Sequence, residues 1–248
     1  MNIMPTAKSH TIRCPKCGYA LPQQASTVYT CPVIGCNTVF DVQNLPLFHP
    51  DPERQNLVVG AVSAPGNGTS GTLSFGRNEK GEIIVVGVNG TPTTVTVPEM
   101  VNGCAVMGIG PRAFANQPQL RRVTLPDTVC TIDEEAFTGC AKLESVTFGK
   151  GLTLLDKGCF SDCPLLDAVT LPAKVNEIGR DAFARCTSLA YVELQGKVEV
   201  IRDGAFELCE SLSTLRYGQR PARVAAGAFT GCYSLPQNVQ DDLFSCAQ

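Results

Sequence analysis

The strongest constraint on the fold is a spacing of 23 residues between successive phenylalanines. The spacing has no slip over the series Phe114, Phe137, Phe160, Phe183, Phe206 and Phe229. A small residue precedes each of them, and three residues after the last five come Cys140, Cys163, Cys186, Cys209 and Cys232. Self-similarity at a fixed period of this length is typical of repeat architectures, in which each unit packs only on its neighbours.

Other apolar positions recur in the same register. A branched aliphatic residue lies five residues before each phenylalanine, and a leucine lies six residues after it. Each unit reads I-x-x-x-A-F-x-x-C-x-x-L-x-x-V-x-L-P. The alternation toward the end of Leu143-Glu144-Ser145-Val146-Thr147-Phe148 predicts a strand with one buried face. The acidic residues of segment 132–137 precede a small–aromatic pair, which indicates a short helical turn.

A single unit of this kind cannot fold alone. About six apolar positions contribute roughly 9–18 kcal/mol when they are fully buried. Ordering one residue of backbone costs ~1–2 kcal/mol, and every unit has 23 residues. The units are therefore expected to stack on one another and share one continuous core.

The repeats resemble the BspA-like class of bacterial leucine-rich repeats over about residues 83–235. The stretch Val95-Thr96-Val97-Pro98 looks like the first, longer unit of that class and aligns with Val123-Thr124-Leu125-Pro126. The resemblance implies an α/β solenoid of 23-residue leucine-rich repeats with a parallel β-sheet on its concave face. It also implies a role in binding or adhesion, typically on cell surfaces or in secreted proteins.

The chain divides into three stretches of different composition. Residues 12–41 hold four paired cysteines, residues 42–71 are rich in proline and glycine and read as a flexible linker, and residues 72–248 are the solenoid. Within the solenoid we expect an N-terminal cap with the first long repeat over 72–105, six units over 106–235, and a C-terminal cap over 236–248. The N-terminal cap should contain a hairpin that turns at residues 78–81, and Leu243 and Phe244 should fold back over the C-terminal end.

The four paired cysteines are Cys14, Cys17, Cys31 and Cys36. Two close pairs at this separation can converge on one tetrahedral ion, and four thiolates close its coordination shell. The Cys-Pro-x-Cys-Gly half resembles the knuckle of zinc-ribbon proteins, whereas the second pair has four residues between its cysteines instead of two. We expect a small N-terminal zinc ribbon with a structural Zn²⁺; iron or a redox-active cysteine pair is the alternative. The five repeat cysteines are expected to be buried thiols.

Residues that alternate with the buried positions form two columns on the strand face. An aromatic side chain and side chains of opposite charge lie toward one end of these columns. Tyr and Arg are common anchors of protein interfaces. The candidate partner-binding residues are Arg122, Thr124, Tyr191, Glu193 and Arg216. An ordinary solvated sheet face is the alternative interpretation of the same pattern.

Composition favours a non-enzymatic binding protein. No phosphate-binding loop or nucleophile elbow occurs, the only histidines are His10 and His49, and no catalytic residue is assigned. The net charge of −3 gives no electrostatic reason to expect nucleic acid or a membrane as partner. Residues 1–13 lack a signal peptide, so a cytoplasmic location is expected.

We predict binding of an unidentified protein through the concave face; the alternatives are a surface adhesin exported without a recognisable signal, and nucleic-acid binding through the zinc ribbon. The oligomeric state is not predicted.

Overall fold

The computed structural model describes residues 71–244 and five short strands that precede them in the chain. The chain divides into two compact units, of which the smaller holds Met1–Arg54 and the larger holds Gln55–Val101 and Ala105–Gln248. The smaller unit contains two antiparallel strand pairs, β1 (Ile12–Arg13) with β2 (Ala20–Leu21) and β3 (Val28–Thr30) with β4 (Val39–Asp41). The larger unit begins with β5 (Ala61–Ser63) and is a parallel β-solenoid.

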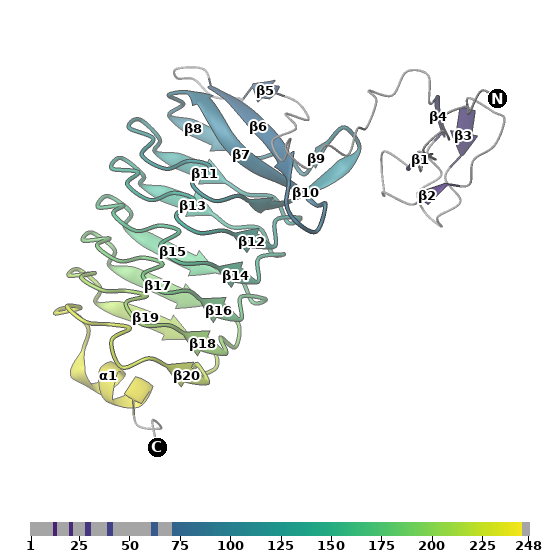
Figure 1. The fold of residues 1–248 in the computed structure, drawn as a ribbon. Helices are drawn as coiled ribbons and strands as arrows, with labels where there is room; N and C mark the ends of the chain where they lie inside the picture. The colour runs from purple at the N-terminus through teal and green to yellow at the C-terminus, as the bar shows by residue number, and fades with distance from the viewer. Residues whose placement is uncertain are drawn as a thin grey trace, which may run out of the picture. The chain divides into compact units, whose positions relative to one another are not determined.

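Each coil of the solenoid contributes one strand to each of two parallel ladders (Figure 1). The first ladder consists of β8 (Thr94–Thr96), β11 (Arg122–Thr124), β13 (Ser145–Thr147), β15 (Ala168–Leu171), β17 (Tyr191–Leu194) and β19 (Thr214–Tyr217). The second ladder consists of β10 (Cys104–Ile109), β12 (Thr131–Ile132), β14 (Leu154–Leu155), β16 (Glu177–Ile178), β18 (Val200–Ile201) and β20 (Arg223–Val224). From β11 and β10 onward, paired residues lie 23 apart in both ladders, as Arg122 with Ser145 and Ile132 with Leu155 show. The predicted 23-residue register is therefore confirmed.

The six phenylalanines form one buried column through the stack. Consecutive rings lie nearly parallel, with centroids 4.8–5.4 Å apart and interplanar angles of 3–8°. Phe229, nearest the C-terminal end, is 7% exposed and the other five are fully buried. The predicted alignment of Val95 with Val123 is also confirmed, because β8 pairs with β11 in that register.

The repeats contain no helix, which differs from the α/β solenoid that the sequence predicts. We call the segment that carries the phenylalanine of each coil, such as 133–140, the Phe turn. Backbone φ is positive two residues before and two residues after most of the phenylalanines, as at Glu135 (56°) and Gly139 (68°) around Phe137. A right-handed helix cannot pass through left-handed residues, so the segment forms a chain of turns instead of the expected helical turn.

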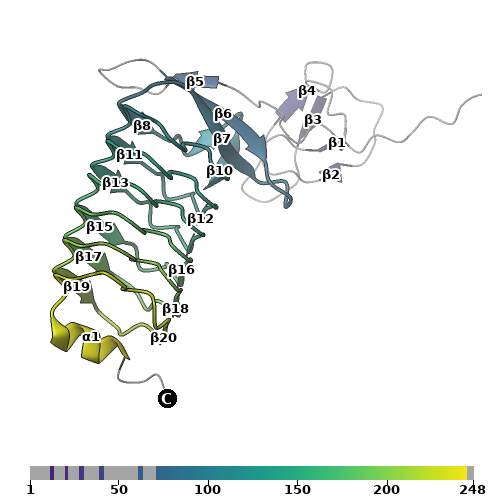
Figure 2. The same cartoon turned by 60° about the vertical axis from the view of Figure 1, so that its left-hand side comes forward.

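Both ends of the solenoid are covered. At the N-terminal end, β6 (Gly71–Arg77) and β7 (Ile83–Gly90) form an antiparallel hairpin, and β9 (Met100–Val101) pairs with β10. The hairpin turns at Asn78–Gly81 as predicted, where Asn78 accepts the Gly81 N–H at 2.9 Å. At the C-terminal end, helix α1 (Gln237–Phe244) buries Leu243, which confirms that this leucine folds back (Figure 2).

The first ladder is interrupted between β13 and β15. It forms two separate three-stranded sheets, whereas the second ladder runs on without a break. Elsewhere the two amides at the start of a first-ladder strand donate to the coil before, as Glu144 and Ser145 do to the Arg121 carbonyl. Within the solenoid that the structure describes, the equivalent amides of Asp167 and Ala168 make no such bond. At this boundary Phe148 replaces a leucine and packs edge-on against Phe160, with ring centroids 5.8 Å apart.

We expect the amide of Ala168 to exchange with deuterium at least about ten-fold faster than those of Ser145 and Tyr191, because exposed backbone without a ladder bond needs no opening to exchange. Residue-resolved hydrogen exchange on the native chain measures this. Equal protection at the three positions would show that the first ladder is continuous in solution.

Close contact between coils constrains some glycines. A Cβ atom at Gly149 would lie 2.0 Å from the Pro126 carbonyl oxygen of the coil before. Gly149→Ala is therefore expected to lower the free energy of unfolding by about 1–3 kcal/mol, as overpacking does. Gly218→Ala is the matched control, because a Cβ atom there meets nothing within 4 Å. Urea denaturation of both variants measures the difference; a Gly149→Ala chain as stable as the control would contradict the packing described here.

Candidate functional site

The structure brings three of the five candidate partner-binding residues together. Tyr191 and Glu193 lie on β17, and Arg216 lies on the neighbouring strand β19, directly opposite Glu193 in the ladder. They alternate with Val192 and Leu215, which are 0% and 7% exposed and form part of the core. The side chains of the three residues therefore share the outer face of the C-terminal half of the first ladder.

The other two candidates lie elsewhere on the ladder. Arg122 and Thr124 are exposed on β11, which belongs to the N-terminal three-stranded sheet. The interruption between β13 and β15 separates them from Tyr191, Glu193 and Arg216. The five residues thus occupy one face of the solenoid but two different sheets.

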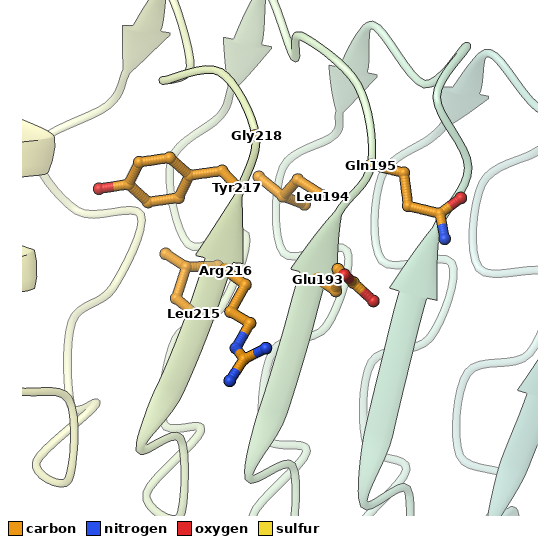
Figure 3. A pocket seen from close by; sticks show the side chains of 7 residues that line it. All are labelled: Glu193, Leu194, Gln195, Leu215, Arg216, Tyr217 and Gly218. Atoms are coloured by element: carbon orange, nitrogen blue, oxygen red, sulfur yellow. The ribbon is translucent and has the colours of Figure 1, made fainter.

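A shallow hollow of about 570 Å³ lies between β17 and β19. Leu194 and Leu215 contribute to its lining although both are nearly buried. The remaining lining residues are Glu193, Gln195, Arg216, Tyr217 and Gly218, and Figure 3 shows how these side chains lie. The hollow combines a small apolar base with charged, amide and phenol groups, which suits contact with another polypeptide.

The two charged residues of the hollow do not pair with each other. The Glu193 carboxylate accepts a hydrogen bond from the Thr170 hydroxyl at 3.5 Å. The guanidinium of Arg216 makes no ion pair or hydrogen bond with any residue in the part of the chain that the structure describes. Figure 3 shows the two side chains pointing in different directions, so both charges are open to a partner.

Tyr217 links the hollow to the C-terminal cap. Its phenol donates a hydrogen bond to the Asp242 carboxylate of α1, and Arg220 Nη2 donates to the Leu243 carbonyl at 2.9 Å. Burial, together with Asp242, raises the pKa of Tyr217 to about 12, so the phenol keeps its proton at neutral pH. The sequence pattern assigns Tyr217 to the apolar series of Leu171 and Leu194, but its half-buried ring lines the hollow. In the sequence, only the hydroxyl of Tyr217 distinguishes it from the leucines of that series.

The five repeat cysteines are buried thiols, as predicted. Each thiol donates a hydrogen bond to the carbonyl of the phenylalanine in the coil before, at Sγ–O distances of 3.0–3.3 Å. Burial raises the pKa of Cys232 to about 11 and that of Cys209 further. A hydrogen bond with Cys163 instead lowers the pKa of Cys140. All five thiols are buried and donate to a backbone carbonyl, and buried thiols of this kind are poor nucleophiles, so this column has a structural role. Within the described part of the chain, no cluster of His, Cys, Asp and Glu side chains is arranged to hold a metal ion.

The predicted metal ligands, Cys14, Cys17, Cys31 and Cys36, lie outside the described residues, as do His10 and His49. The strands around them are described. In the chain, the first cysteine pair falls between the antiparallel partners β1 and β2, and the second falls between β3 and β4. The only helix that the structure describes, α1, is too short to cross a membrane.

Structural comparison finds similar solenoids. A leucine-rich-repeat protein from T. pallidum matches with a TM-score of 0.56 and 26% sequence identity, over 71% of this chain and 94% of that protein. A leucine-rich cell surface protein from Faecalibacterium prausnitzii A2-165 matches with a TM-score of 0.53 and 22% identity, over 66% of this chain and 41% of that protein. The second likeness concerns the fold alone, and this chain spans less than half of that protein.

Sequence comparison identifies the family. A search of curated proteins finds no match. Residues 108–236 match the model of the BspA type leucine-rich repeat region in six copies, which covers more than half of the chain. These six copies coincide with the coils that carry the phenylalanine column. The chain therefore belongs to the BspA-type leucine-rich-repeat family.

Proposed function

We propose that this chain is a non-enzymatic protein-interaction module that binds a partner through the outer face of the first ladder, the face that the sequence predicts to be concave. The observation that carries the proposal is the hollow between β17 and β19, whose lining includes Glu193 and Arg216 beside Tyr191. An unpaired guanidinium, an exposed carboxylate and two tyrosines within two neighbouring strands are the kind of groups that anchor protein interfaces.

The family supports this proposal. Leucine-rich-repeat proteins of this type are in general protein-interaction or surface proteins, and the solenoid fold is typically non-enzymatic. The hollow is open and lacks a set of acid, base and nucleophile groups held within reach of one another, which the described residues would have to supply for catalysis. Binding through an extended solenoid face is what such a site can do.

The triple variant Tyr191→Ala, Glu193→Ala, Arg216→Ala is expected to weaken capture of the native partner by about ten-fold or more, since interface energy concentrates in a few anchors. Affinity capture from the source cells, with quantitative mass spectrometry of the bound proteins, measures this. The matched control is Asn176→Ala, Glu177→Ala, Arg223→Ala, which changes a polar, an acidic and a basic residue at the second ladder. Retention of every partner by the first variant would overturn the proposed surface.

We also propose that Cys14, Cys17, Cys31 and Cys36 bind one structural Zn²⁺ in the N-terminal unit. Four thiolates match the ligand preference of zinc, and two short hairpins whose connecting segments each supply one cysteine pair are a suitable frame for a closed site. A segment of about thirty residues such as 12–41 is too short to bury a sizeable apolar core, and metal binding can supply its folding free energy.

Purified full-length chain is expected to contain about one zinc per molecule, because four thiolates complete one tetrahedral shell. The variant Cys14→Ser, Cys17→Ser should lose it, whereas Cys130→Ser should keep it. Elemental analysis of the three proteins measures their zinc content per molecule. Iron in place of zinc, or equal zinc in all three proteins, would contradict the proposal.

A further inference from the structure

The charged side chains of the Phe turns differ from those of the turns that join the two ladders. Every Lys and Arg of the Phe turns has a carboxylate partner: the pairs are Arg112–Glu135, Lys157–Glu134, Arg180–Asp203, Arg185–Asp162 and Arg202–Glu177. Four further turn carboxylates have no ion pair among the described residues: Asp133, Asp156, Asp181 and Glu207. The Phe turns therefore form an acidic side on which all cations are neutralised locally.

The turns that join the two ladders carry a row of cations. We call the segment that joins a first-ladder strand to the second-ladder strand of the same coil, such as 149–153, the linking turn. Successive linking turns carry Lys150, Lys174, Lys197 and Arg220. Lys197 pairs with Glu199 at 2.9 Å, whereas the exposed side chains of Lys150 and Lys174 have no ion pair in the described solenoid. Coils stack about 5 Å apart, as the phenylalanine rings show, so the row is continuous.

The row of lysines leads into the hollow. Gln195 and Gly218 line the hollow and are the first residues of the linking turns that carry Lys197 and Arg220. Arg216, which has no partner in the described chain, lies on the same strand immediately before Tyr217 and Gly218. One surface thus joins a row of cations, of which Lys150, Lys174 and Arg216 have no ion pair in the described chain, to a recess of about 570 Å³.

We propose that this surface binds an extended acidic segment of the partner protein, with carboxylates against Lys174, Arg216 and Lys197, which would exchange its exposed ion pair with Glu199 for one with the segment. The proposal rests on the proposed function and names the chemistry of its partner. An extended chain places alternate side chains ~6.6 Å apart, which flexible lysines on successive coils can follow. Glu193 would repel a carboxylate in the hollow, so the segment presents a hydrogen-bond donor at that point. The order of carboxylates and hydrogen-bond donors along the segment therefore sets its position relative to the coils.

The arrangement favours a peptide over a nucleic acid. Asp127, Glu199 and Glu193 interrupt the cations along the edge and in the hollow. A polynucleotide carries a phosphate at every residue and would meet each of these carboxylates. A peptide can place neutral or donor groups opposite them and carboxylates opposite the lysines.

The test uses the full-length chain and a fluorescein-labelled peptide of about ten residues that alternates Glu and Ser, an extended length that spans the row. Fluorescence anisotropy at low and at moderate salt gives the affinity. Lys174→Glu should weaken binding about three-fold, and Lys174→Glu with Lys197→Glu about ten-fold, as loss of exposed charge pairs predicts. The control Lys80→Glu with Lys142→Glu makes the same net-charge change away from the linking turns and should alter the affinity less than about two-fold.

Three outcomes would overturn the proposal. The first is absence of peptide binding at low salt, and the second is equal weakening by the linking-turn and control variants. The third is binding of a single-stranded oligothymidylate as tightly as the acidic peptide, which would mark a general polyanion surface. None of these outcomes bears on the proposed function, since loss of the native partner in the Tyr191, Glu193 and Arg216 variant is measured separately.

Discussion

The stacking of one coil on the next is the interaction on which the rest of the structure depends. Each coil has too little core to fold alone, so its phenylalanine ring, its cysteine and its backbone amides all find their partners in neighbouring coils. The near-parallel rings and the thiol-to-carbonyl hydrogen bonds repeat at the same interval as the strand ladders. A side chain at one position therefore has a fixed neighbour 23 residues away, which is why ion pairs such as Lys157–Glu134 occur at that separation.

This register also creates the candidate site. Tyr191, Glu193 and Arg216 are distant enough in sequence that only the parallel pairing of β17 with β19 brings them to one surface. The cap contributes as well, because Tyr217 holds Asp242 of α1 and so fixes one side of the hollow. The linking turns add their cations to the same end of the molecule. The proposed recognition groups on this solenoid are thus products of stacking and not of any single repeat.

The sequence predicted the repeat, its register and the buried face because apolar identity recurs at fixed intervals. It also placed Tyr191, Glu193 and Arg216 on one face, since alternation along a strand decides which side a residue takes. It missed the second ladder, whose strands have two residues in most coils and show no alternation. It predicted a helical turn at 132–137 because left-handed positions there are filled by residues such as Glu135, which carry no glycine signal. The open ladder beside Phe148 and the role of Tyr217 depend on packing between coils, which periodicity cannot reveal.

The absence of helices from the repeats has a geometric consequence. An α-helix with its side chains is about 10 Å across, twice the distance between neighbouring strands, and a helix on one side of each coil would spread that side and bend the stack. Here the second ladder is hydrogen-bonded throughout, and the first is hydrogen-bonded on both sides of its one interruption between β13 and β15. Outside that interruption both sides of a coil advance by one strand spacing, so no helix spreads one side of the stack relative to the other. The proposed partner would then make its contacts along a line of successive coils and not within a concave surface.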